Sequence, residues 1–294
     1  MAAPAAPLPE APVARPRRGG DILTHLILLA GVALFALPLW IVLMGSTHDA
    51  ASIGRGEVPL LPGGHAAENY GAAWAGGRVG TTATIPVAVM LLNSLVMATA
   101  IAVGKIAISL ISAFAVVFFR FPGRMLAFWA IFITLMLPVE VRIFPTFKVV
   151  SDLGLMDSYA GLIVPLIASA TATLLFRQFF LTIPDEFVEA AKIDGAGPMR
   201  FFLDVVVPLS RTNMAALFVI LFVYGWNQYL WPLLVTTSGD VETIVVGIVK
   251  MIGSEANTDW NTVMATTVLA LLPPVAVVLL MQRWFVKGLT DTEK

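Results

Sequence analysis

The amino-acid sequence predicts an all-α integral membrane protein with six transmembrane helices. Of its 294 residues, 58% are hydrophobic and only 13% are charged, and its mean hydropathy is +0.87. Soluble domains have about a quarter of their residues charged. The apolar residues also form runs near the roughly 20 residues that a helix needs to cross a bilayer. We therefore expect most of the chain to lie in a membrane.

The composition also argues against several classes of function. A net charge of −1 leaves no basic stripe for nucleic acid, and the absence of cysteine excludes disulfides, thiolate metal sites and cysteine nucleophiles. Three histidines without an H-E-x-x-H motif argue against a metal centre. No G-x-x-x-x-G-K-[ST] motif occurs, so ATP hydrolysis would require another polypeptide. We expect no catalytic residue, cofactor or metal in this chain.

The N-terminal region divides into a tail and a first helix. Residues 1–20 are rich in Ala and Pro, which predicts a disordered tail. The apolar run 23–44 has the length of a transmembrane helix. A cleaved signal peptide is the alternative. The run is long for such a peptide and no A-x-A cleavage site follows it, so we favour a retained helix.

The rest of the chain, 21–294, forms one predicted transmembrane domain. A polar, Gly-rich segment at 45–86 and a polar connection at 140–158 separate some of its apolar runs. The remaining transmembrane helices are predicted at 87–119, 125–138, 159–180, 214–235 and 263–285. Six crossings place both termini on the same side of the membrane.

The basic residues predict that this side is the cytoplasm. With both termini inside, the inner segments contain Arg15, Arg17, Arg18, Arg120, Arg124, Arg177, Lys192, Arg200, Arg211, Arg283, Lys287 and Lys294. The outer segments then contain only Arg55, Arg78, Arg142, Lys148 and Lys250. This bias of about two to one follows the positive-inside rule.

The polar stretch 184–208 lies between two apolar runs and has its own signals for local structure. Pro184 suits a first helical position, and two acidic residues follow in the first turn, where they favour the positive end of the helix dipole. Gly195 is typical of a helix C-terminus, and Pro198 permits a second helix to begin. We expect a helix, a tight turn and a second helix within a cytoplasmic loop at 182–212.

This loop resembles the E-A-A-x3-G-x9-I-x-L-P signature of bacterial ABC importer membrane subunits, with Val in place of Ile and Leu. The resemblance implies the type I ABC importer fold and a loop that docks into an ATP-hydrolysing subunit. The implied ATPase-coupling residues are Glu189, Ala190, Ala191, Asp194, Gly195 and Pro208. An E-A-A-K sequence is also simply good helix-forming sequence, but the long spacing to Gly195 and Pro208 argues against that reading.

The resemblance extends along nearly the whole chain to the carbohydrate-type, maltose-permease-like family, and within it to glycerophosphate-importing members. It is carried by 135–145, 157–161 and 224–231. It implies a multi-pass protein of the bacterial plasma membrane that imports sn-glycerol-3-phosphate or glycerophosphodiesters. Its implied partners are a second homologous permease subunit, two ATP-binding subunits that bind ATP and Mg, and an extracytoplasmic substrate-binding protein approached by the acidic segment 238–260.

Three other functions stay open. The first is import of a neutral sugar or oligosaccharide by the same kind of subunit. The second is an ion-driven secondary transporter, although such a protein should have acidic residues buried within its spans and none clearly lies inside one. The third is a membrane scaffold that transports nothing.

Polar residues in or near the spans are candidates for the substrate pathway because polar groups in lipid are costly. Lys105 is the only basic residue in the middle of an apolar run, away from its ends, and it could instead snorkel outward or pair with a carboxylate of a neighbouring subunit. Glu140 and Arg142 follow the third run, where the guanidinium could bind phosphate or the two could form a plain surface pair.

An aromatic and amide cluster lies in the fifth run. Its members are Trp226, Asn227, Gln228, Tyr229 and Trp231. At least one amide must face protein or water because neither can be satisfied by lipid. We expect the cluster to line the pathway, and a packing seam with the partner permease is the alternative.

Overall fold

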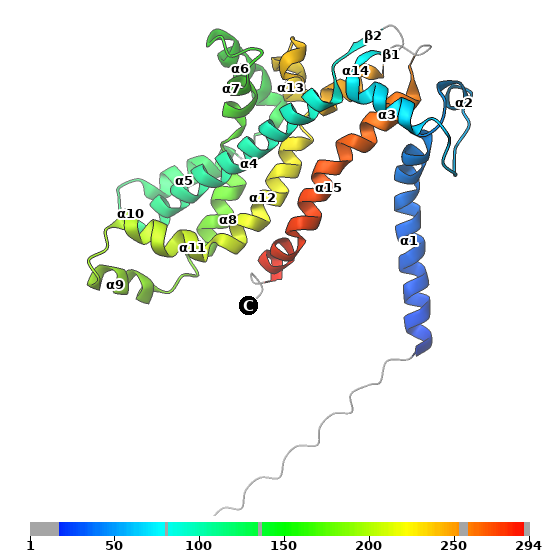
Figure 1. Ribbon diagram of the computed structural model, residues 1–294. Helices are drawn as coiled ribbons and strands as arrows, with labels where there is room; N and C mark the ends of the chain where they lie inside the picture. The colour runs from blue at the N-terminus through cyan, green and yellow to red at the C-terminus, as the bar shows by residue number, and fades with distance from the viewer. Residues whose placement is uncertain (1–17, 80–81, 135–136, 253–257, 291–294) are drawn as a thin grey trace, which may run out of the picture.

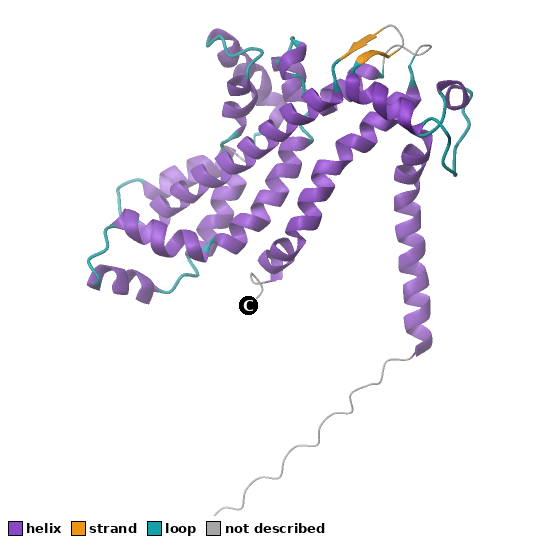
Figure 2. Cartoon of the chain, viewed as in Figure 1, coloured by secondary structure: helices purple, strands orange, loops and turns teal. Residues whose placement is uncertain are grey.

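The computed structural model describes residues 18–79, 82–134, 137–252 and 258–290. Figure 2 shows that helices make up nearly all of this part of the chain, together with one small antiparallel hairpin of β1 (Gly77–Val79) and β2 (Thr82–Thr84). The all-α prediction is therefore confirmed apart from this hairpin. Most of the predicted tail, 1–17, lies outside the described residues, and its last three residues begin the first helix.

The bundle is built around α4 (Val87–Phe118), a helix of 32 residues (Figure 1). Half of its most apolar segment is buried inside the chain, against almost none for the first helix, α1 (Arg18–Gly45). Two helices pack along α4, namely α8 (Ala170–Phe180) and α12 (Arg211–Trp226), and α15 (Trp260–Thr290) packs along α12. By contrast, α1 stands apart and touches the bundle mainly through α15 (Figure 1).

Within the described residues, three helices are long and apolar enough to cross a membrane, namely α1, α4 and α15. Two bent pairs could each provide one more crossing. The first joins α7 (Tyr159–Ile163) and η2 (Val164–Leu166) to α8 at 47°. The second joins α10 (Pro198–Phe201), η3 (Phe202–Val206) and α11 (Val207–Leu209) to α12 at 70°.

Six uninterrupted spans are thus not confirmed. Within the third predicted span, α5 (Arg124–Ile133) has ten residues, about 15 Å of helix, which is half the thickness of the hydrocarbon layer. The fifth predicted span is not one helix, because the chain leaves the helical conformation after Trp226 and resumes it in α13 (Leu230–Val235).

Segments predicted as polar connections contain helices. Within the predicted connection at 140–158 lies α6 (Val139–Asp152), a helix that the sequence did not predict. Ile143, Phe147 and Val150 fall on one face of α6 and pack in a core cluster with Trp231, a pattern that the intervening polar residues obscured. The other added helices are α2 (Ala50–Gly54), α3 (Ala66–Ala75), η4 (Gly239–Val241) and α14 (Ile244–Met251).

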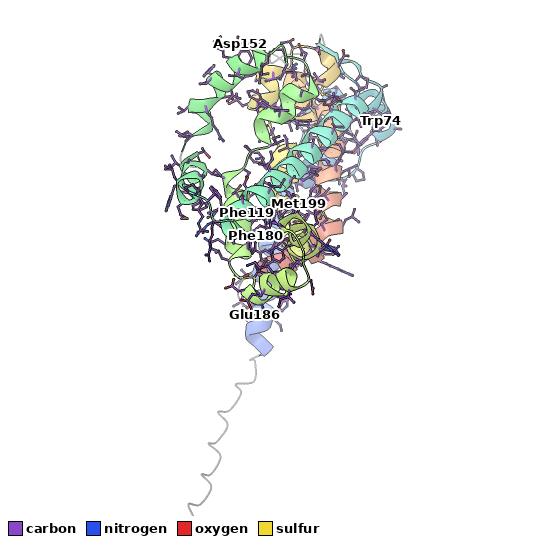
Figure 3. All side chains as sticks on the ribbon, turned by 90° about the vertical axis from the view of Figure 1, so that its left-hand side faces the viewer. Trp74, Phe119, Asp152, Phe180, Glu186 and Met199 are labelled. Carbon is purple, nitrogen blue, oxygen red and sulfur yellow. The ribbon has the colours of Figure 1, made fainter. Side chains whose placement is uncertain are left out.

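The molecule has two distinct ends. Figure 3 shows Asp152 and Trp74 at one end and Glu186 toward the other. We call the first the hairpin end and the second the α9 end, after α9 (Asp185–Ile193). The first turn of α1 and the last turn of α15 also lie toward the α9 end (Figure 1).

Buried polar contacts tie the helices together at the hairpin end. Asn93 on α4 donates to the carbonyls of Asp240 (3.0 Å) and Glu242 (2.9 Å) and accepts a hydrogen bond from the Tyr159 hydroxyl (2.5 Å). Asn261 on α15 donates to Asn69 on α3 at 2.7 Å. These contacts determine how α4 and α15 meet the surface elements.

A second set of hydrogen bonds joins the turn before α7 to the segment that follows α13. Asp157 accepts hydrogen bonds from the Thr237 hydroxyl and amide (both 2.5 Å) and from the Ser238 amide (2.7 Å). The Thr237 hydroxyl has the largest effect, and together these donors lower the pKa of Asp157 from 3.8 to about 2. Asp157 adopts a positive φ of 51°, which Asn also tolerates well.

We predict that Asp157→Asn lowers the thermal stability of the purified protein by removing this charge while preserving the backbone conformation. A carboxylate with a depressed pKa stabilises the folded state above its unfolded pKa of 3.8, and this contribution is lost as the pH falls toward about 2. The Tm difference between wild type and variant should therefore be largest near neutral pH and shrink across that range. A difference that is constant across that range would contradict the prediction.

Candidate functional site

The predicted coupling helix is present as α9, and its ends follow the sequence signals. Pro184 is the residue immediately before the first helical turn, rather than inside it as expected. At the other end, the Gly195 amide donates to the Lys192 carbonyl (3.1 Å) and the Ala196 amide donates to the Ala191 carbonyl (2.8 Å). This is a Schellman motif, and it places Gly195 at a φ of 69°.

One face of α9 packs on the bundle, and the other is open. Val188 and Ala191 are partly buried against the main core. The open face, which we call the α9 surface, consists of Phe187, Glu189, Ala190, Ile193 and Asp194. Phe187 is 44% exposed and Ile193 is 86% exposed. Within the described residues neither acid of this surface has an ion-pair partner, so it combines apolar contacts with unpaired negative charge.

The elements after the turn connect α9 firmly to α4. Phe202 of η3 packs on Phe114 with ring centres 4.8 Å apart, and Phe201 of α10 packs on Phe118 at 5.3 Å. Pro208 lies just after η3, a π-helical turn, and a proline cannot donate the usual hydrogen bond to the residue four positions earlier. A displacement of α9 would therefore be passed through aromatic contacts to the end of α4.

Lys105 lies in the middle of α4 and is only 7% exposed. Its Nζ atom lies 3.9 Å from the centre of the Tyr224 ring on α12, a cation–π contact. Lys105 therefore does not snorkel to the surface, and no carboxylate pairs with it among the described residues. Arg142 is exposed on α6.

The aromatic cluster is divided by the break in the helix. Trp226 and Trp231 are 3% and 4% exposed, so both side chains are buried in this conformation, and pathway lining stays a prediction for them. Trp226 stacks on Phe222, and the Trp231 indole donates to the Gly161 carbonyl at 3.2 Å. Both rings are held by the core.

Asn227, Gln228 and Tyr229 occupy the break itself, between α12 and α13. The side chains of Asn227 and Tyr229 are exposed, and Gln228 donates to the Tyr224 carbonyl at 3.2 Å. Pathway lining stays a prediction for these three residues, Lys105 and Arg142. The Glu140 side chain lies outside the described residues.

Sequence reasoning missed Tyr224. It is 119 positions from Lys105 in the chain, and no local motif links the two. A signal was nevertheless available, because a lysine inside an apolar helix requires a partner and an aromatic face can supply one. Ile193 was also missed as part of the α9 surface; its apolar character in a polar loop was the corresponding signal.

We predict that Gly195→Ala loosens the C-terminal turn of α9. A left-handed conformation costs a residue with a Cβ atom about 1–2 kcal/mol, which corresponds to roughly tenfold faster amide hydrogen exchange at Ala196. Gly197→Ala is the matched control, because Gly197 has an ordinary φ of −71° and open space around it. Equal exchange in the two variants would contradict the role of the Schellman turn.

Comparison with known proteins gives a consistent result. A family model described as "Binding-protein-dependent transport system inner membrane component" matches residues 105–291. The chain is 58% identical to the sn-glycerol-3-phosphate transport system permease protein UgpE of Yersinia pestis bv. Antiqua (strain Antiqua), over 95% of this chain and 99% of that protein. It is 59% identical to the protein of the same name from Rhizobium meliloti (strain 1021), over 93% and 97%.

A solved structure also has this fold. It is a chain of a bacterial ABC transporter involved in the import of the acidic polysaccharide alginate, with a TM-score of 0.78 and 22% sequence identity. The match covers 91% of this chain and 97% of that chain. At this identity the likeness concerns the fold alone.

Proposed function

Because the chain belongs to the family of binding-protein-dependent transport system inner membrane components, we propose that it is a permease subunit of an ABC importer for sn-glycerol-3-phosphate or glycerophosphodiesters. The observation that carries this proposal is 58–59% identity, over more than nine tenths of the chain, to permeases named for sn-glycerol-3-phosphate transport. The chain is a multi-pass membrane protein of the inner membrane.

In the proposed topology the chain crosses the membrane six times and the α9 end faces the cytoplasm. The terminal turns of α1 and α15 lie toward that end, as an even number of crossings requires (Figure 1). The excess of basic residues in the segments assigned to the inside supports the same orientation. The hairpin end would then meet the substrate-binding protein.

The proposed coupling partner is an ATP-hydrolysing subunit that receives the α9 surface. Exposed Phe187 and Ile193 would enter its groove, while Glu189 and Asp194 would meet charges at its rim. Closure of the two ATPase subunits would displace α9, and the phenylalanine contacts would carry the displacement to α4. In this proposal the bundle, with its partner permease, then alternates between outward and inward access while this chain performs no bond chemistry.

Lys105 and Arg142 support a phosphate-bearing substrate over a neutral sugar. A guanidinium can bind phosphate with two hydrogen bonds, and a buried ammonium gains from a nearby anion. Asn227 and Gln228 at the helix break provide amides for glyceryl hydroxyls. A neutral oligosaccharide would offer no negative charge to either residue.

Uptake by the complete importer reconstituted in vesicles should require ATP and the substrate-binding protein. Binding-protein-dependent ATPase stimulation across glycerophosphates and neutral sugars tests the substrate. Stimulation by neutral sugars alone would contradict the proposed cargo, and uptake driven by an ion gradient without the ATPase would contradict the proposed class.

We predict that Gly195→Trp inserts into the membrane normally but uncouples ATP hydrolysis from transport. A bulky group at this left-handed position would distort the turn that follows the α9 surface. Gly154→Trp is the control, because Gly154 has a similar φ of 67° but lies near the hairpin end. Normal substrate-stimulated ATPase activity and uptake in Gly195→Trp would contradict the coupling role.

We predict that Lys105→Met and Arg142→Gln each reduce kcat/KM for sn-glycerol-3-phosphate uptake by about tenfold or more, the usual effect of losing a charged hydrogen bond. Lys148→Gln is the control on α6, because Lys148 is exposed and paired with Asp152 at 2.9 Å. Unchanged KM and rate in both test variants would remove Lys105 and Arg142 from the site.

A further inference from the structure

Two arginines flank a buried phenylalanine where α5 packs on α8. The guanidinium carbon of Arg177 lies 4.4 Å from the centre of the Phe128 ring. Arg124 is one helical turn before Phe128 on α5, so its side chain lies on the same helix face. Phe128 is only 6% exposed. One arginine thus contacts Phe128 and the other lies one helical turn before it, on two helices that pack on each other.

These charges have no counter-ion among the described residues. The Arg177 Nε atom is buried and has no hydrogen-bond partner. Arg124 donates from Nη1 to the Phe119 carbonyl at 3.3 Å, which leaves its other donors available. Arg120, in the turn before α5, also forms no ion pair with another described residue. The Phe128 ring stabilises the Arg177 charge but accepts no hydrogen bond from Nε. An anionic acceptor from outside this chain would therefore further stabilise these partly buried guanidinium groups.

The surface beside the arginines is apolar. Leu126, Trp129 and Ile133 of α5 are 76%, 51% and 56% exposed. Phe121, next to Arg120, is 40% exposed. Basic groups at one end of an apolar helix face, together with a tryptophan, match the layering of a membrane interface, where headgroups adjoin acyl chains.

We propose that Arg124 and Arg177, with Arg120 at the edge, bind the phosphate of an anionic phospholipid in the inner leaflet. The two guanidinium groups supply several N–H donors to the phosphate oxygens, and the acyl chains lie along the exposed face of α5. The lipid supplies the missing counter-ion and covers a helix that is too short to cross the bilayer alone. This proposal depends on α4 ending at the cytoplasmic interface and does not depend on the cargo.

The test uses the complete importer in nanodiscs of phosphatidylcholine mixed with phosphatidylglycerol, followed by native mass spectrometry of the retained lipid. We expect wild type to retain phosphatidylglycerol in preference to phosphatidylcholine. Each of Arg124→Gln and Arg177→Gln should reduce that retention about fivefold, because one interfacial arginine contributes about a fivefold change in binding of an anionic lipid. Arg200→Gln is the control, because Arg200 lies toward the same end and pairs with Asp204.

Three results would overturn the proposal. The first is equal retention of the two lipids by wild type, and the second is unchanged retention of phosphatidylglycerol in both test variants. The third is displacement of the lipid by inorganic phosphate or free glycerol-3-phosphate at millimolar concentration, which would indicate a site for a soluble anion. If Arg177→Gln does not fold, Arg177→Lys replaces it in the test. This variant keeps the positive charge and should retain more phosphatidylglycerol than Arg124→Gln. Uptake measured in parallel reports on the transport function separately.

Discussion

The structure depends on the need to satisfy every polar group that α4 carries into the bundle. Asn93, Ser94, Lys105 and Ser109 are all buried along this helix. Since lipid cannot accept or donate hydrogen bonds, each of these groups must find its partner in the protein. Ser94 accepts a hydrogen bond from the Ile244 amide at 2.8 Å, and Ser109 donates to the Ser169 carbonyl at 3.2 Å. Each polar group therefore specifies which segment lies beside α4.

Close packing completes what the polar contacts begin. A Cβ atom on Gly225 would lie 2.9 Å from the Ala98 Cα atom, so only glycine allows α12 to approach α4 this closely. Small residues at helix contacts are the usual means of association in membranes, where the hydrophobic effect does not drive helices together. The approach brings Tyr224 of α12 to Lys105. The cation–π contact between Lys105 and Tyr224 thus follows from the packing of small residues.

The same helix links the two proposed functional regions. Phe114 and Phe118, near one end of α4, contact the elements that follow α9. Lys105 lies 13 residues before Phe118, about 20 Å along the helix axis. A rigid helix of this length can transmit a displacement at the α9 end to Lys105. The proposed lipid site is formed by α5 and α8, which both pack on α4. A bound lipid would therefore affect how α4 is held by these two helices.

The sequence by itself determined the membrane class, the main apolar helices and the two ends of α9, because hydropathy, proline and glycine act over short distances in the chain. It also placed Gly195 at the C-terminal turn of α9, where the backbone adopts a left-handed conformation. Only the tertiary structure decided that α6 is a helix, that the fifth apolar run breaks after Trp226, and that Trp226 and Trp231 belong to the core. The physical reason is that burial, helix breaks and the partner of a buried charge depend on contacts between distant segments. Lys105 was identifiable as a polar group needing a partner, but only the packing of α12 on α4 selected Tyr224.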